Sequence, residues 1–488
     1  MFYALRKDCY IRKIGEYGYI KSSGLFNDLV FNQSGCVFLL ALSRTPQSLE
    51  ELTQRVAKAF IDVRAEDILG DAEEFYGILT EDGYVVMGAT AEETEKNNVG
   101  FHYSEIQQIS LEEDYTPKNI RSSEESQKLL DVYFRKHPYL ANFQIELTSK
   151  CNERCIHCYI PHEYKNTAIS DDLYYSVLRQ LKEMGTLGVT LSGGEPMVHP
   201  HFKEYLKAAK DSDFYVHVLS NLTLLDDEMV EIMRDGNTCG VQVSLYSMIP
   251  EHHDAVTTVL GSFEKTKSAI LKLIENNIPV QISCPVMKAN KDDVSGVIRW
   301  GHQHKLRVNV DYSIMAEYNH CTSNLAHRLT PDECRDVIQS IIDYDEDYQS
   351  QIAELGAEVH SRTSVVEEYD PDAPFCGIAV NTACMVSNGN VYPCPGWQDY
   401  ICGNLAQTSL EEIWTSSKEM LYLRSLKRSD LKQCSSCENK AFCSPCLVRF
   451  ANESPTGNPL EIAEHFCEVA EVNKETVMRY LGKTRGSC

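Results

Sequence analysis

The run L147-T-S-K-C151-N-E-R-C155-I-H-C158-Y159 decides how the rest of the chain is interpreted. It places Cys151, Cys155 and Cys158 on one short segment, with three and then two residues between them. Three thiolates at this spacing can hold three irons of a 4Fe–4S cluster, and the fourth iron then has no protein ligand. A cluster that only carries electrons normally uses four cysteines. The run therefore favours an enzyme in which a cofactor or substrate binds the open iron.

Zinc and disulfides are the alternatives for these cysteines. Zinc sites usually combine a CxxC pair with a second pair from elsewhere, so Cys155 and Cys158 would suffice and Cys151 would be surplus. Disulfides are less favoured, because the start M1-F-Y-A-L-R-K has no long apolar segment and no cleavage site that would indicate secretion. A membrane span needs about eighteen apolar residues in a row, and the chain has no such run. The expected location is cytoplasmic.

Three polar motifs follow apolar, strand-like runs further along the chain. Ser192-Gly-Gly-Glu-Pro follows G188-V-T-L191, Y215-V-H-V-L-S-N221 ends in two small polar residues, and Ser244 stands at the end of a third run. Paired glycines leave bare backbone at the end of a strand, close to where a ligand binds in parallel α/β folds. Each motif alone is also typical of an ordinary turn.

Taken together, the cysteine run and these motifs resemble the signature of the radical S-adenosylmethionine (SAM) enzymes. In that family the open iron binds the amino and carboxylate groups of SAM, and one electron splits the sulfonium to methionine and a 5′-deoxyadenosyl radical. The resemblance places His157 beside the adenine and Ser220 and Asn221 near the ribose. The other cofactor-binding positions that it implies are Gly193, Gly194 and Glu195, at the SAM amino group, and Ser244.

Strand-like runs alternate with amphipathic helical stretches, which predicts a parallel sheet with helices outside it. The predicted strands are Phe143–Leu147, Gly188–Leu191, Tyr215–Leu219, Gly240–Leu245, Pro279–Met287 and Arg307–Ser313. The predicted helices are Asp171–Glu183, Phe202–Ser212, Asp226–Asp235, Phe263–Asn276 and Asp292–His304. Six units are too few for a closed eight-stranded barrel, so we expect an α/β fold with a partial (β/α)6 barrel. Its active site should lie at the carboxyl ends of the strands.

The carboxyl-terminal part carries nine cysteines between Cys376 and Cys467. Zinc ribbons are one explanation, since two CxxC pairs suit one tetrahedral site, but a single zinc would leave five of the cysteines unused. The pattern resembles the SPASM domain, an extension of radical SAM enzymes that carries auxiliary clusters. One departure is that Cys443 and Cys446 have two residues between them where that family has three.

The SPASM resemblance implies two auxiliary 4Fe–4S clusters, three clusters in all. It assigns Cys376, Cys394 and Cys446 to the first auxiliary cluster. Cys384 is the expected fourth ligand, with an open iron as the alternative, and Cys402 is expected to be structural. The ligands implied for the second auxiliary cluster are Cys434, Cys437, Cys443 and Cys467.

The amino-terminal part combines short strands with three helices and resembles a winged-helix unit. The formal charge of the chain is −25, with 46 Lys and Arg against 71 Asp and Glu, which disfavours a nucleic-acid partner. The alternative is the peptide-recognition domain fused to maturases of ribosomally made peptides, in which a leader peptide adds a strand to a sheet edge. A purely structural packing module remains open. The polar segment that follows reads as a linker with a short helix near Glu124–Arg135 and without a fixed large interface.

The expected organisation is a recognition domain over residues 1–90, a linker over 91–138, the partial barrel over 139–370 and the SPASM domain over 371–488. The resemblances imply a radical SAM maturase that installs a crosslink, with a thioether favoured, in a leader-bearing peptide. A flavodoxin or ferredoxin type of donor is expected to supply the low-potential electrons. Alternatives are oxidation of a protein Cys or Ser, as in sulfatase maturases, carbon–carbon crosslinking or epimerisation, and a non-enzymatic iron–sulfur protein. No general base can be named, and Asp311 is expected to be solvated or capping rather than catalytic.

Overall fold

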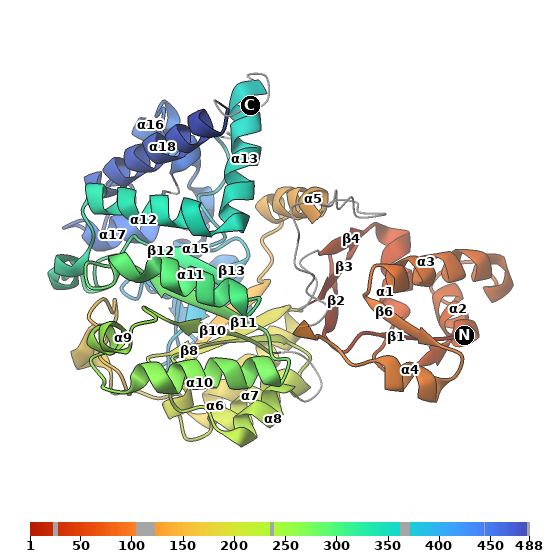
Figure 1. The fold of residues 1–488 in the computed structure, drawn as a ribbon. Coiled ribbons are helices and arrows are strands. Elements are labelled where there is room, and N and C mark those ends of the chain that lie inside the picture. Colours follow the sequence, from red (N-terminus) through yellow and green to blue (C-terminus); the bar gives the residue numbers. More distant parts are fainter. Residues whose placement is uncertain (23–27, 104–122, 235–238, 362–370, 444, 486–488) are drawn as a thin grey trace.

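The computed structural model describes residues 1–22, 28–103, 123–234, 239–361, 371–443 and 445–485. The amino-terminal residues form a lobe on one side of the molecule, and the sheet-and-helix body with the carboxyl-terminal helices forms the other side (Figure 1). None of the helices in the described ranges is both long and apolar enough to cross a membrane.

A row of six parallel strands forms the centre of the body. The strands are β7 (Asn142–Thr148), β8 (Gly188–Gly193), β9 (Tyr215–Ser220), β10 (Cys239–Ser244), β11 (Val280–Pro285) and β12 (Arg307–Asp311). They lie side by side in chain order, and each neighbouring pair is parallel. This confirms the predicted α/β fold with a partial six-unit barrel.

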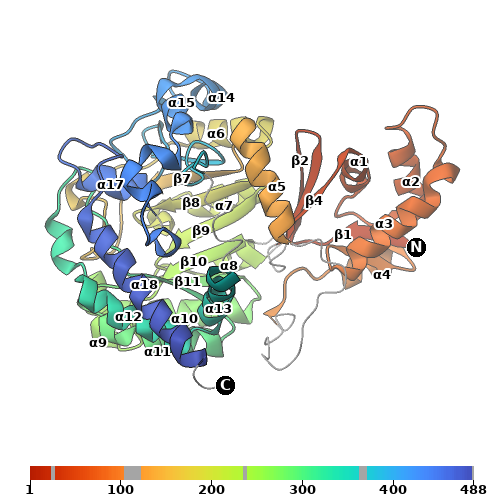
Figure 2. The ribbon, with the colours of Figure 1, turned by 90° about the horizontal axis from the view of Figure 1, so that it is seen from above.

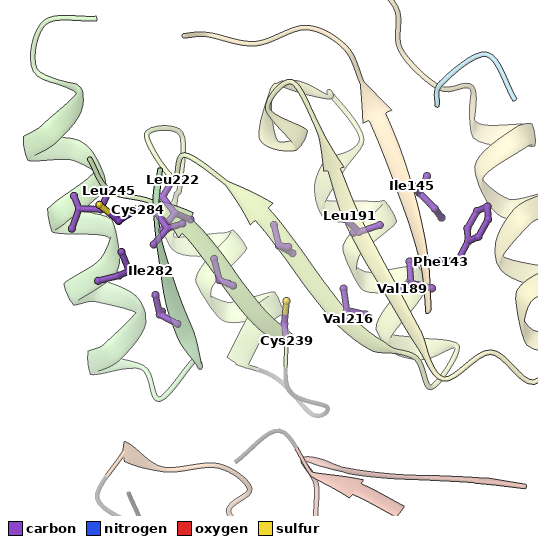
Figure 3. Packing of buried hydrophobic residues seen from close by; sticks show 14 of the residues in the cluster. Phe143, Ile145, Val189, Leu191, Val216, Leu222, Cys239, Leu245, Ile282 and Cys284 are labelled. Atoms are coloured by element: carbon purple, nitrogen blue, oxygen red, sulfur yellow. The ribbon is translucent and has the colours of Figure 1, made fainter. Parts of the chain in front are cut away.

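Helices cover the outer face of these strands. They are α6 (Asp171–Glu183), α7 (Phe202–Asp211), α8 (Asp227–Arg234), α10 (Ser262–Glu275), α11 (Val294–Gln303) and α12 (Pro331–Tyr344). Helix α9 (Pro250–Thr257) lies instead against the loop of the three cysteines, whose Arg154 and Ile156 N–H groups donate to its last carbonyls. Every second residue of a strand points toward the covering helices, as Figure 3 shows for Ile145, Leu191 and Val216. These apolar side chains are buried in one large core. The alternate residues of each strand face the inside of the barrel, which we call the lumen.

The residues on the lumen side of the strands are mostly polar and partly exposed. They include Gln144, Thr190, His217, Gln242, Ser244, Gln281, Ser283 and Asn309. A closed barrel of this kind normally fills its interior with branched apolar side chains. The lumen of this chain is therefore built to contact something polar.

The cysteine-rich part continues the same sheet, which the sequence did not indicate. Strand β13 (Thr382–Met385) pairs in parallel with β7, and Cys384 lies opposite Gln144. Strands β14 (Asn390–Tyr392) and β15 (Gly403–Asn404) follow in antiparallel order. Strand β13 covers what would otherwise be an open strand edge, and it places Cys384 directly beside β7, the strand that leads to Cys151.

The remaining carboxyl-terminal elements are helical. They are α13 (Glu346–Ser361), α14 (Leu410–Ser416), α15 (Lys418–Ser425), α16 (Lys432–Ser435), α17 (Leu447–Glu453) and α18 (Glu464–Arg485). In Figure 1 the long helix α18 lies beside α12 of the barrel, with which it makes extensive contacts. The cysteine-rich part thus packs against the barrel through α18 on α12, α14 on α6 and β13 on β7.

The amino-terminal lobe has two small sheets and a core of its own. One sheet joins β1 (Phe2–Leu5), β5 (Gln47–Ser48) and β6 (Val85–Gly88), and the other joins β2 (Cys9–Ile14), β3 (Tyr17–Ser22) and β4 (Leu29–Phe31). Its helices are α1 (Gln33–Ala41), α2 (Leu49–Ala57), α3 (Leu69–Glu81) and α4 (Ala91–Asn97). Strands followed by three helices appear in the predicted order. Helix α4 packs on β1 and β6, so the lobe extends beyond residue 90 into the expected linker.

The lobe is fixed to the amino ends of the barrel strands, and the expectation of a loosely attached domain is wrong. Arg12 and Arg44 both form ion pairs with Asp213, at 3.1 and 2.6 Å, in the turn before β9. A shared apolar cluster joins the lobe, the helix α5 (Ser123–Lys136) and the barrel, and it contains Tyr10, Ile14, Tyr19, Leu130, Phe134, Leu187 and Val380. Figure 2 shows α5 between the lobe and the barrel. Residues 104–122 of the expected linker lie outside the described residues.

Candidate cluster and cofactor site

The three cysteines of the opening run lie on the loop that follows β7, at the carboxyl end of the sheet. All three are free thiols and are partly buried. The pKa of Cys155 is raised well above its ordinary value, first by burial and also by the neighbouring charges of Glu153, Cys158 and Cys151. The loop therefore carries all three thiols at the carboxyl end of β7.

The paired glycines hold this loop against β8. A Cβ atom on Gly193 would lie 2.1 Å from the carbonyl oxygen of Thr148, and one on Gly194 would lie 2.5 Å from that of Lys150. Gly193 also has a φ of +150°, which side chains rarely adopt. The backbone N–H of Gly194 donates to Thr148 at 2.8 Å, and that of Glu195 donates to Lys150 at 2.9 Å. The glycines are thus needed for the close approach of the two chain segments.

The side chain of Glu195 is buried and ties the ends of two strands together. Its carboxylate accepts hydrogen bonds from Ser220 Oγ at 2.8 Å, from the backbone N–H of Asn221 at 2.8 Å and from that of Met197 at 3.0 Å. Burial raises the pKa of Glu195 to about 7, while these hydrogen bonds act in the opposite direction. Asn221 in turn donates to Asn152 in the cysteine loop at 2.9 Å. The glycine, ribose-position and cysteine motifs are therefore one connected network.

His157 contacts a tyrosine, Tyr246, that the sequence analysis missed. The ring nitrogen Nε2 of His157 lies 3.0 Å from the hydroxyl of Tyr246, and this hydroxyl also donates to Cys155 Sγ at 3.7 Å. Ser244 is the last residue of β10, two positions before Tyr246. Burial lowers the pKa of His157 to about 4, so its ring is neutral. Tyr246 follows Ser244 by two residues, and its place after a strand end was the only signal in the sequence.

The Tyr246 hydroxyl is expected to support the thiolate of Cys155, and Tyr246→Phe tests this. The variant keeps the ring and removes only the hydroxyl, so packing should be preserved. Loss of a hydrogen bond behind a metal ligand typically costs about 10-fold or more in metal affinity or activity. We expect the variant to retain its cluster at the three-cysteine loop less well by about that factor. The measurements are iron content and SAM cleavage after the protein is diluted. Tyr312→Phe, on the loop after β12, is the matched control and should behave as the wild type.

Seven of the carboxyl-terminal cysteines line one cavity of 550 Å³. They are Cys376, Cys394, Cys434, Cys437, Cys443, Cys446 and Cys467. Burial raises the pKa values of Cys376, Cys394 and Cys443, with smaller contributions from Cys446 to the first two and from Cys434, Cys467 and Cys437 to the third. The SPASM resemblance assigns Cys376, Cys394 and Cys446 to one group of ligands and the other four to a second group, and this division stays a prediction. Cys384 is buried outside this cavity, and its pKa is raised in part by Cys394.

The donor set fits iron–sulfur clusters. Every cysteine in the two groups is a free thiol, and soft thiolates suit iron–sulfur clusters. Within the described ranges, no three or more His, Cys, Asp or Glu side chains converge closely enough to hold a single metal ion. Ligands of a cluster surround a larger object than one ion, so they stand further apart. The arrangement is therefore better suited to clusters than to the zinc considered from the sequence.

A buried acid between the two cysteine regions was also missed. Glu146 of β7 is buried, and its Oε1 accepts a hydrogen bond of 2.7 Å from Gln398 in the cysteine-rich part. Burial raises the pKa of Glu146 to about 8, and the hydrogen bond from Gln398 opposes this only in part. Its charge would also raise the pKa of Tyr159, next to Cys158, and of Cys384. The only signal in the sequence was a charged residue within the buried run F143-Q-I-E-L147.

The raised pKa of Glu146 predicts that stability falls with rising pH. The neutral acid is favoured in the folded state, so its contribution is complete below the ordinary value of 4.5 and is lost as the pH rises toward 8. Glu146→Gln keeps a neutral side chain and should remove this loss, which reaches roughly 4 kcal/mol as an upper figure. We expect the variant to melt higher than the wild type at about pH 8.5 and to match it at about pH 4, below the ordinary pKa of the acid. The exposed Glu228→Gln is the control, and parallel pH profiles of wild type and Glu146→Gln would contradict the assignment.

Comparison with known proteins identifies two domains. Residues 145–301 match the family model of the radical SAM superfamily, and residues 376–438 match the SPASM iron–sulfur cluster-binding domain. An AdoMet-dependent heme synthase of Methanosarcina barkeri is 25% identical over 338 residues, which are 66% of this chain and 94% of that protein. The sporulation killing factor maturation protein SkfB of Bacillus subtilis is 25% identical over 285 residues, 56% of this chain and 64% of that one.

A solved structure resembles nearly the whole chain. It is Streptococcus suis SuiB bound to the precursor peptide SuiA, with a TM-score of 0.59 and 15% identity over 95% of this chain and 99% of that one. At this identity the likeness establishes the fold. The radical SAM domain binds SAM and a 4Fe–4S cluster, and the SPASM domain binds auxiliary iron–sulfur clusters. With the cysteine loop, the glycine and strand-end network and the seven-cysteine cavity in place, the chain is a radical SAM enzyme with a SPASM domain.

Proposed function

We propose that this enzyme is a maturase of a ribosomally made peptide with a leader, and that it installs a crosslink, with a thioether favoured. The observation that carries the proposal is the polar lumen joined to the amino-terminal lobe. A single cavity of 610 Å³ is lined both by Lys21 and Asp28 of the lobe and by His217, Gln281 and Arg307 of the barrel. A chain bound by the lobe would therefore enter the barrel directly.

The lobe offers an edge at which a leader can add a strand. Strand β4 ends the order of its sheet, and among the described residues it pairs only with β3. Next to it, Phe31 of β4 contacts Phe75 of α3, with ring centroids 5.2 Å apart, and both rings are only partly buried. An open strand edge beside apolar side chains supports main-chain pairing with selection by alternate residues.

The names of two similar proteins agree with this assignment. SkfB is named as a maturation protein of the sporulation killing factor, and SuiB was solved with its precursor peptide SuiA. The heme synthase likeness leaves a third of this chain unaligned, and the lobe with its connected cavity is the feature that a small-molecule enzyme would not require.

Bound SAM and clusters supply a 5′-deoxyadenosyl radical at the carboxyl end of the strands and an acceptor for one electron in the SPASM domain. The protein positions the reacting groups around them. The loop with Cys151, Cys155 and Cys158 is fixed by Gly193 and Gly194, and Glu195 fixes the ends of β8 and β9. A thioether forms when a substrate carbon loses a hydrogen atom and a cysteine sulfur bonds to that carbon, releasing a proton and an electron.

This reaction removes two hydrogens from the peptide, and mass spectrometry can detect that loss. Wild-type enzyme with SAM and a reductant should lower the mass of the peptide encoded in the reading frame beside this one by two hydrogens. Blocking its cysteines beforehand should prevent the change. A mass loss that survives blocking would favour a carbon–carbon crosslink, and an unchanged mass with inverted centres would favour epimerisation. Oxidation of a protein Cys or Ser without any change in the peptide would favour a sulfatase-maturase type of activity and contradict the proposal.

A further inference from the structure

The lumen wall formed by β10, β11 and β12 carries three amide side chains without a partner. Among the described residues, the side chains of Gln242, Gln281 and Asn309 make no hydrogen bond, and all three are at least partly exposed. By contrast, Gln144 on the opposite wall donates to Ser192 Oγ at 2.7 Å. Gln242 and Gln281 lie directly opposite each other in the strand register. An amide side chain offers both a donor and an acceptor, the same pair of groups that a peptide backbone presents.

Positively charged side chains lie at the end of this wall that faces the lobe, where β11 and β12 begin. Gln281 lies opposite Arg307 at the start of β12, and both line the 610 Å³ cavity that reaches Lys21 of the lobe. Lys305 lines the same cavity. Among the described residues that line it, Asp28 is the acidic one. Asp28 forms an ion pair of 3.2 Å with Lys21, so the lining keeps an excess of positive side chains through Lys305 and Arg307. It favours a negatively charged ligand at this end.

The other end of the wall, where β12 ends, lies near the cavity lined by the seven carboxyl-terminal cysteines. On β12, Arg307, Asn309 and Asp311 alternate with the buried Val308, so they share the lumen side. Asp311 forms an ion pair of 2.9 Å with Arg449, and Arg449 lines the 550 Å³ cavity with the seven cysteines. Arg307 and Asp311 are four residue steps apart on β12, a span of about 13 Å. An extended peptide of about four residues covers the same distance. The same row of side chains therefore leads from the lobe to the auxiliary-cluster cavity.

We propose that the precursor peptide crosses the barrel as an extended segment along β10, β11 and β12, and that the residues of this segment nearest the leader are acidic. Gln242, Gln281 and Asn309 hydrogen-bond its backbone, and Arg307 pairs with its acidic residue. The segment runs parallel to β12, from the lobe toward Arg449. This inference rests on the proposed peptide substrate and adds where the peptide lies and which charge it carries.

Photo-labelling tests the path without requiring turnover. The probe is a short capped peptide with Asp-Glu at its amino end, a photoleucine in the middle and a Gly-Ser tail, added at millimolar concentration to the reconstituted full-length enzyme. Mass spectrometry should locate the label on β10, β11 or β12. Replacing Asp-Glu of the probe by Lys-Lys should reduce this labelling by about tenfold, because the charge pair inside the lumen is lost. In Arg307→Glu the preference should reverse.

The amide contribution is tested separately by Gln281→Leu, which keeps the volume and removes the hydrogen-bonding groups. Labelling should fall about fivefold, as expected for a lost neutral hydrogen bond. Gln339→Leu on α12, where the side chain donates a hydrogen bond of 2.8 Å to Asp343 and lines neither cavity, is the control and should label as the wild type. Label found elsewhere on the surface, or labelling unaffected by probe charge and by Arg307→Glu, would overturn the proposed path. Peptide modification without labelling of the path would reject this inference alone, whereas labelling without any modification would reject the proposed function alone.

Discussion

Replacing Cys155 by alanine is expected to abolish SAM cleavage, so that 5′-deoxyadenosine falls to the background of enzyme-free controls. Cys155 lies at the centre of the loop, where its sulfur contacts Tyr246 and Glu153. Two thiolates cannot hold a cluster in the orientation that leaves one iron open. The chemical step depends on that cluster, so no partial activity should remain. The measurement is chromatography of 5′-deoxyadenosine after anaerobic reduction with dithionite.

Cys284→Ala is the matched control for this variant. Cys284 is a fully buried free cysteine of β11 that faces the helices and takes no part in either cysteine region. It should lose only packing energy and should retain SAM cleavage per bound cluster. Iron analysis distinguishes loss of one cluster from misfolding, because Cys155→Ala should still bind its auxiliary clusters. Substantial SAM cleavage by Cys155→Ala would contradict the assignment of the loop.

The second large effect concerns the amino-terminal lobe. Removing residues 1–97 should not change the SAM cleavage that the enzyme performs in the absence of peptide. Peptide modification should fall about 100-fold or more, because tethering by the leader no longer raises the local peptide concentration. The deletion ends after α4, since this helix packs on β1 and β6. The measurements are 5′-deoxyadenosine release and modified peptide, determined in the same reaction.

Deletion also uncovers apolar residues that pack against the lobe, such as Leu187 of the barrel and Val380 of the cysteine-rich part, so a second variant is needed. Arg12→Ala combined with Arg44→Ala removes both ion pairs to Asp213 in the full-length chain. This double variant should lower peptide modification about tenfold while leaving SAM cleavage unchanged. Arg64→Ala in the same lobe, whose ion pairs are local to Glu66 and Asp67, is the control. Full modification by the truncated enzyme would contradict leader docking on the lobe.

Local signals in the sequence were sufficient for most of the barrel. The predicted helix Asp171–Glu183 coincides with α6, because Ser170 caps its first turn and the apolar residues repeat at helical spacing. The strands were recognisable because both core-facing and lumen-facing positions follow the period of a strand. The confirmed fold therefore rests on short-range patterns that a single sequence contains.

Long-range contacts could not be predicted in the same way. The pairing of β13 with β7 joins residues about 240 positions apart, and T382-A-C-M385 is too short to show a period. Arg12 and Arg44 have nothing in their surroundings in the sequence that points to Asp213. Glu146 and Tyr246 are single polar residues whose partners, Gln398 and His157, come from distant segments. The candidate cysteines were found because their spacing is local, whereas the groups around them became visible only in the fold.

Electron–nuclear double resonance of the reduced enzyme with SAM labelled at its amino nitrogen and carboxylate oxygen tests the central claim most directly. The claim is that one iron of the cluster on the Cys151–Cys158 loop is free to bind this cofactor. We expect couplings from both labels to the cluster signal of the wild type and of Cys284→Ala, and none in Cys155→Ala. A wild-type signal that loads fully with iron but shows no coupling to either label would contradict the account.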